Sequence, residues 1–149
     1  MAATQVITEF AKLDDITMYY ASYGDGDPLI LLHGGLSSGD NFVYQVPEFS
    51  KTYRVITPDS RGQGRSTDSD EPLTYHLMAE DVVQLMDYLE LQSAFIVGWS
   101  DGGNIALDMA INHPDRVRAL VTYGANASPA GLKPSATSFF ESASAETLQ

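Results

Sequence analysis

The chain has 149 residues, enough for one domain with its own core, and its 44% hydrophobic and 19% charged residues are typical of a globular protein rather than a disordered or membrane protein. Twenty acidic residues against eight basic ones give a net charge of −12, which disfavours nucleic acid as a partner because such a surface repels phosphates. There is no cysteine, no apolar run of the ~20 residues that a membrane span needs and no signal-peptide pattern at the start, so we expect a cytoplasmic protein.

Strands and helices are expected to alternate after an opening pair of strands. Apolar runs such as Leu29-Ile30-Leu31-Leu32 are typical of strands covered on both faces, and Thr74 can cap a helix with apolar residues at helical spacing. The expected elements are strands at 6–10, 16–23 and 29–32, a short helix within 41–49, a strand at 53–57, a helix at 75–90, a strand at 94–97, a helix at 104–112 and a strand at 117–123. This order predicts an α/β fold, a mainly parallel sheet with helices on both faces.

The composition changes near the end of the chain. Residues 1–126 contain the expected strands and helices, whereas residues 127–149 are rich in Ala, Ser and Pro. Only Phe139 and Phe140 could anchor this second segment to a core. We expect residues 127–149 to form a tail, at the place where a lid would begin, with no recognisable terminal element.

The most informative motif is Gly98-Trp99-Ser100-Asp101-Gly102, which stands between an expected strand and an expected helix. A Gly-x-Ser-x-Gly motif in this context raises a serine hydroxyl on a strained turn above a parallel sheet. The two glycines have a steric role, because side chains there would collide with the neighbouring strand and helix.

Four motifs together resemble the α/β-hydrolase family over nearly all of residues 29–126. They are His33-Gly34-Gly35, the segment 59–66 (DSRGQGRS), the segment 98–103 (GWSDGG) and the segment 112–117 (NHPDRV). Their order and spacing fit the family. The segment 98–103 together with Tyr123-Gly124-Ala125-Asn126 looks most like the valacyclovir-hydrolase (biphenyl-hydrolase-like) branch.

The resemblance implies a serine hydrolase that acts on a carboxylic ester, lactone or amide-like bond through an acyl-enzyme. Ser100 would be the nucleophile. The backbone N–H groups of Asp101 and Gly35 would form the oxyanion hole, with Leu36 as the alternative to Gly35. Gly34, like Gly35, would let the substrate oxygen approach the backbone closely.

Two residues of the elbow have two interpretations each. Asp101 could meet an ammonium group of the substrate, or it could simply be an acid at a helix N-terminus, where the helix dipole stabilises it. Trp99 could shape the acyl pocket or pack the elbow. Nearby, Asp59, Arg61 and Arg65 could line the substrate entrance, but a tight glycine turn held by a local Asp–Arg pair explains them better.

The resemblance leaves the catalytic histidine and acid unassigned, because in the family the histidine lies near the end of a much longer chain. Of the three histidines, His113 fits a helix C-terminus, His33 fits a loop-shaping role, and His76 starts a helix at the active-site end of the sheet. We therefore expect the N-terminal half of a hydrolase, without the later strands and helices of the fold.

Two other functions stay open. One is a non-catalytic module whose open sheet edge binds a partner, and the other is a cofactor-free perhydrolase or lyase on the same scaffold. A serine nucleophile argues against haloalkane dehalogenases and epoxide hydrolases, which attack with a carboxylate. We expect a small ester-like substrate, no cofactor, no metal, no nucleic acid or membrane partner, and either self-association or a complementing C-terminal fragment.

Overall fold

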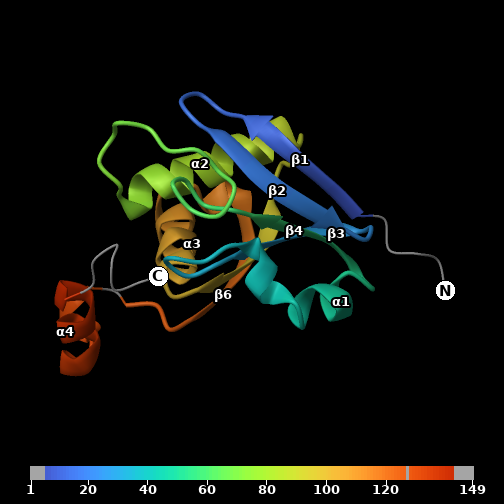
Figure 1. Ribbon diagram of the computed structural model, residues 1–149. Coiled ribbons are helices and arrows are strands. Elements are labelled where there is room, and N and C mark those ends of the chain that lie inside the picture. The colour runs from blue at the N-terminus through green and yellow to red at the C-terminus, as the bar shows by residue number, and fades with distance from the viewer. Residues whose placement is uncertain (1–5, 127, 143–149) are drawn as a thin grey trace.

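The computed structural model describes residues 6–126 and 128–142, and their strands form one sheet of six (Figure 1). The strand order is β1-β2-β4-β3-β5-β6. The strands are β1 (Val6–Lys12), β2 (Thr17–Tyr23), β3 (Asp27–Leu32), β4 (Tyr53–Pro58), β5 (Ala94–Trp99) and β6 (Val117–Tyr123). β1 with β2 and β2 with β4 pair antiparallel, whereas β4, β3, β5 and β6 run parallel to one another.

Helices cover both faces of this sheet, as the sequence predicts. The short helices η1 (Gly39–Phe42) and α1 (Gln45–Phe49) lie on one face, and α2 (Tyr75–Tyr88) and α3 (Asp101–Asn112) lie on the other (Figure 1). Two hydrophobic clusters result from the two-residue period of the strands. In β3, Leu29 and Leu31 point toward η1 and α1, while Ile30 and Leu32 point toward α2 and α3. The prediction of a mainly parallel α/β sheet is confirmed.

The helix ends follow local signals to different degrees. The side chain of Thr74 accepts a hydrogen bond from the backbone N–H of Leu77 at 3.1 Å, so the predicted cap of α2 is confirmed. Helix α3 begins at Asp101 and not at Asn104, because the Asn104 N–H bonds to the Ser100 carbonyl and closes a first turn that contains two glycines. Glycine's low helix propensity hid this turn from sequence reasoning.

The segment after β6 contains a short turn of helix, η3 (Pro129–Gly131), and the helix α4 (Pro134–Ser142). The sequence predicted neither of these two elements, and the expectation that the tail has no recognisable terminal element concerns an end of the chain, residues 143–149, that lies outside the described residues. Proline is favoured in the first turn of a helix, which accounts for the start of α4 at Pro134. The anchoring role expected of Phe139 and Phe140 lies outside what the structure describes. Figure 1 shows α4 standing apart from the sheet and its covering helices.

Candidate active site

Ser100 lies at the sharp junction between β5 and α3, where φ is 53° and ψ is −116°. A positive φ is strained for a residue with a side chain, and such strain gathers at functional sites. A Cβ on Gly98 would collide with the carbonyl oxygen of Gly102, and a Cβ on Gly102 would collide with the carbonyl oxygen of Leu32 in β3. The steric role that the sequence assigns to the two glycines is confirmed.

The side chain of Ser100 is not used by the helix that follows it. Ser100 stands at the N-cap position, where serine commonly accepts a hydrogen bond from the first turn, yet it makes no side-chain capping bond. Its backbone N–H donates to the Tyr123 carbonyl at 2.9 Å, which ties the elbow to the end of β6. Ser100 is half-buried and stands at the carboxyl end of the parallel strands, where ligands bind in open α/β sheets.

The loop after β3 lies directly against the serine. A Cβ on Gly34 would lie 3.3 Å from the Cβ of Ser100, and the Asp101 carboxylate occupies the space that a Cβ on Gly35 would need. Leu36 follows with φ 56°, so two of the three non-glycine residues of positive φ in the described segments border this site. The structure thus brings the loop and the elbow together, as the sequence predicts.

Which backbone groups bind an oxyanion stays a prediction. Asp101 is the first residue of α3, and the N–H groups in the first turn of a helix have no partner within that helix. Gly35 and Leu36 are both exposed, so both interpretations of the second donor stay open.

Trp99 ends β5 beside this site, and its side chain is 36% exposed. Its ring stacks on that of Tyr123, with centroids 6.4 Å apart and an interplanar angle of 12°. Trp99 therefore packs the elbow. Because part of its side chain is exposed, the predicted contribution of Trp99 to an acyl pocket stays a prediction.

His33 is a buried link between two loops. Its Nε2 accepts a hydrogen bond from the Ser60 N–H at 2.9 Å, so its proton is on Nδ1, which lies 2.7 Å from the Gly34 carbonyl oxygen. Burial lowers the pKa of His33, and the neutral ring is the form that these contacts need. The loop-shaping role predicted for His33 is confirmed.

We expect His33 to make the fold less stable in mild acid. The pKa of His33 is lower in the folded protein than its ordinary value of about 6.5. At a pH between these two values, the unfolded chain binds more protons than the folded one. The free energy of unfolding is therefore fully present above about pH 6.5 and decreases as the pH falls. Urea unfolding of wild type and His33→Gln over this pH range checks this. The wild type should lose more stability than the variant on acidification, and parallel curves would refute the prediction.

The other two histidines join helices α2 and α3. His76 Nδ1 lies 2.9 Å from Asp108 Oδ1, and His113 Nε2 lies 2.6 Å from Glu80 Oε1. Asp108 raises the pKa of His76. Within residues 6–126 and 128–142, no histidine hydrogen-bonds to Ser100, so the structure gives the serine no base in this part of the chain.

The loop after β4 contains the expected Asp–Arg pair. Asp59 Oδ2 lies 2.8 Å from Arg65 Nε, and Asp59 Oδ1 accepts a hydrogen bond of 2.8 Å from the Gly39 N–H. Between them along the loop, Gly64 has a positive φ of 55°. The interpretation as a tight glycine turn is confirmed for Asp59 and Arg65.

Arg61 does not belong to this pair. Its buried guanidinium makes two hydrogen bonds of 2.7 Å to the buried carboxylate of Asp81 and two, of 3.0 and 3.2 Å, to Asp15. The bonds to Asp81 raise the pKa of Arg61. Sequence reasoning missed this network, although Asp81, a lone acid on the apolar face of α2, was a usable signal.

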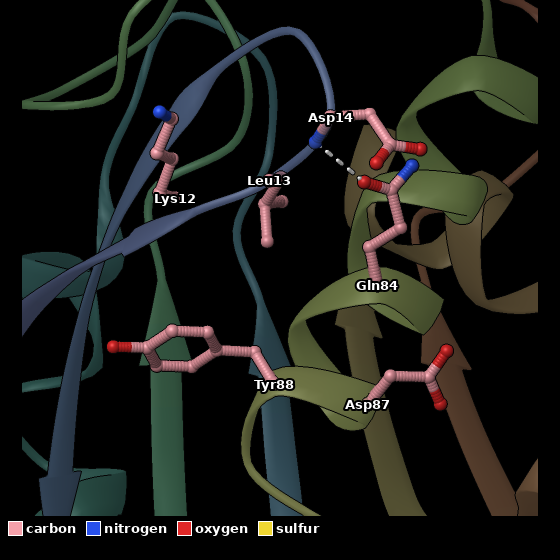
Figure 2. Close-up of a pocket in the computed structure, with 6 residues that line it drawn as sticks. All are labelled: Lys12, Leu13, Asp14, Gln84, Asp87 and Tyr88. Carbon is pink, nitrogen blue, oxygen red and sulfur yellow. Dashed lines mark hydrogen bonds between the residues drawn. The ribbon is translucent and has the colours of Figure 1, made fainter.

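A separate pocket lies at the far end of α2. It has a volume of about 560 Å³ and opens between the turn after β1 and the second half of the helix (Figure 2). Its lining residues are Lys12, Leu13, Asp14, Gln84, Asp87 and Tyr88, none of which belongs to the elbow or to the loop after β3. In the described residues no group of three acidic or histidine side chains could hold a metal ion, and no helix is long and apolar enough to cross a membrane.

Comparisons with known proteins agree with this geometry. A family model described as the alpha/beta hydrolase fold matches residues 27–141. The chain is 41% identical over 105 residues to a 2-hydroxymuconate semialdehyde hydrolase of Pseudomonas sp. (strain CF600), covering 68% of this chain and 37% of that protein. It is 35% identical over 130 residues to the serine hydrolase BPHL of Homo sapiens, covering 83% of this chain and 45% of that protein.

A solved structure, described as Est816 as an N-acyl homoserine lactone degrading enzyme, superposes with a TM-score of 0.81 at 32% identity. The match covers 90% of this chain and 52% of that one. The chain thus spans less than half the length of the two curated relatives and about half of this structural neighbour.

Proposed function

The chain belongs to the α/β-hydrolase family, and from that premise we propose that it carries the nucleophile and the oxyanion hole of a serine hydrolase. The observation that carries the proposal is the strained backbone of Ser100, whose side chain does not cap the helix and lies against the glycine loop after β3. Holding a serine in this conformation costs free energy and gives α3 no cap, so packing alone does not account for it.

The proposed reaction is acyl transfer from an ester, lactone or amide-like bond. Ser100 Oγ attacks the carbonyl carbon, and a general base takes its proton and passes it to the leaving group as that bond breaks. Water then attacks the acyl-enzyme and regenerates the hydroxyl. The N–H of Asp101 and that of Gly35 or Leu36 stabilise the oxyanion of both tetrahedral intermediates. The description of the structural neighbour as a lactone-degrading enzyme supports this class of bond.

We further propose that the base and its acid come from a segment outside these 149 residues, because each of the three histidines hydrogen-bonds to a group other than Ser100 in the described parts. "Completed enzyme" below means this chain together with that segment, supplied as a longer polypeptide or as a second fragment.

A fluorophosphonate probe tests the proposal directly, because such probes label only an activated serine. The completed enzyme should be labelled at Ser100, located by mass spectrometry of the labelled peptide. The alternative of a binding module, in which the elbow is structural, predicts no labelling of the folded protein.

We expect residues 1–149 alone to be nearly inert and to self-associate. Without a base, Ser100 keeps an ordinary hydroxyl. β6 is the edge strand of the described sheet, and Val121 in it is 61% exposed. Because an edge strand has unpaired backbone groups and this one also exposes apolar surface, we expect a second copy of the chain or a complementing fragment to pair with it. Light scattering and an assay with p-nitrophenyl esters check both parts. A monodisperse monomer with enzyme-like turnover would contradict them and would point to an overlooked base, with His76 as the first candidate.

A further inference from the structure

Hydrogen bonds join the loop after β3, which would supply one oxyanion donor, to the loop after β4. In the middle of the first loop, the backbone N–H of Ser37 donates to the side-chain Oε1 of Gln63 at 3.4 Å. This bond comes directly after the exposed residues Gly35 and Leu36. The bonds on either side of it are buried, and they join His33 to Ser60 and Gly39 to Asp59.

Leu36 is the residue whose conformation depends on this middle bond. Its φ is 56°, a left-handed conformation that a residue with a side chain keeps only where its surroundings enforce it. The Gln63 side chain holds the peptide group that directly follows Leu36. If that group were free to turn, Leu36 could relax to a negative φ, and the N–H groups of Gly35 and Leu36 would change direction. One of these two groups is the expected second oxyanion donor.

A second contact to Ser37 does not do the same work. Asn41 Nδ2 donates to the hydroxyl of Ser37. A side chain can turn about its Cα–Cβ bond while the backbone stays in place, and the reverse also holds. The bond from Asn41 therefore fixes the Ser37 hydroxyl, whereas the bond to Gln63 fixes the peptide group.

The backbone around Gln63 is itself well held, so its side chain is presented in one place. The Gln63 N–H donates to the Ser60 carbonyl at 3.0 Å, and the Gln63 carbonyl accepts from the Ser66 N–H at 3.1 Å. The glycines on either side, Gly62 and Gly64, turn with φ 68° and 55°. Gln63 is half-buried, so water competes less for its Oε1 than it would at a fully exposed residue.

We propose that Gln63 is a positioning residue for the oxyanion hole: its Oε1 holds the Ser37 N–H and thereby keeps Leu36 in the conformation that directs the second oxyanion donor. The inference rests on the proposed function and adds a specificity to it. Donors of fixed direction fit an oxygen at the reacting carbonyl. Esters are therefore preferred over thionoesters, in which a larger sulfur, a weak hydrogen-bond acceptor, takes the place of that oxygen.

The test compares kcat/KM of the completed enzyme for an ester and for the thionoester with the same acyl and alcohol groups. Gln63→Leu removes the acceptor at nearly constant size, and Gln63→Glu keeps an oxygen acceptor at the same place. Gln84→Leu is the matched control, because Gln84 Oε1 also accepts a backbone N–H, that of Asp14 at 2.9 Å, in the second half of α2 (Figure 2). The urea midpoint of each variant reports its stability.

We expect Gln63→Leu to lower the ratio of kcat/KM for the ester over the thionoester about three- to fivefold, the scale of one lost hydrogen bond between neutral groups. For the ester the loss should lie in kcat with KM little changed, because the oxyanion forms only on the way to the tetrahedral intermediate. Gln63→Glu should keep the ratio at or above its wild-type value, since a carboxylate accepts a stronger hydrogen bond than an amide does. Its added charge acts on both substrates alike and cancels in the ratio. Gln84→Leu should leave the ratio unchanged.

An equal loss for ester and thionoester in Gln63→Leu, or the same fall of the ratio in Gln63→Glu, would show a merely structural role and overturn the inference. If Gln63→Leu does not fold, Gln63→Ala takes its place, because it removes the acceptor and adds no large apolar side chain to the loop.

Fluorophosphonate labelling of the wild type separates this failure from failure of the proposed function. A wild type that labels at Ser100, with a ratio that Gln63→Leu does not change, defeats the inference alone. A folded wild type that neither labels nor turns over defeats both.

Discussion

Replacing Ser100 with alanine should lower ester hydrolysis by the completed enzyme at least ~10³-fold and leave the fold intact. The loss is large because every later step needs the acyl-serine, and only the oxyanion donors and substrate binding remain to accelerate the reaction. The fold should survive, because the Ser100 side chain makes no capping bond to α3. Alanine and serine both carry a Cβ, so the strain of the positive φ at this position is about the same for the two residues.

The measurement is kcat/KM for a p-nitrophenyl ester, together with circular dichroism and the urea midpoint of each variant. Ser93→Ala, which removes a serine hydroxyl just before β5, is the matched control and should keep full activity. Unchanged turnover by a correctly folded Ser100→Ala protein would remove Ser100 from the mechanism.

The second large effect is on stability. Replacing Asp81 with alanine should lower the free energy of unfolding by about 3 kcal/mol or more, because it leaves the buried guanidinium of Arg61 without its main partner. Asp15 stays within reach of Arg61 at 3.0 Å, but its side chain is partly exposed and offsets only part of the loss. The loop from Asp59 to Ser69 should also become more mobile in Asp81→Ala, because Arg61 donates a hydrogen bond to the Ser69 hydroxyl.

Urea unfolding at neutral pH measures this effect. Glu48→Ala provides the control, because it breaks an ion pair with Lys51 that is exposed on both sides, and such pairs contribute between about 0 and 1 kcal/mol. A loss of stability in Asp81→Ala no larger than that in Glu48→Ala would mean that Arg61 finds water or another acceptor once Asp81 is gone.

The sequence by itself determined the sheet, the two helical layers and the position of the candidate nucleophile on the turn between β5 and α3. These features depend on short-range signals: the apolar run at 29–32, the cap at Thr74 and the glycines on either side of Ser100. Each of these signals acts within a few residues, so the sequence alone is enough to predict the structural feature that it specifies. The first turn of α3 and the helix α4 were missed because their residues are weak helix formers by composition alone.

The tertiary structure alone decided which distant side chains meet. Arg61 joins Asp81 and Asp15, His33 joins Ser60, and Tyr75 joins Asp101, over separations of 20 to 46 residues. No local rule selects these partners, because several other acids lie at similar distances along the chain and differ only in where the packed sheet and helices place them. The Asp101 carboxylate is such a case: the residue was visible in the motif, but its hydrogen-bond partner, Tyr75, lies 26 residues earlier, at the start of α2.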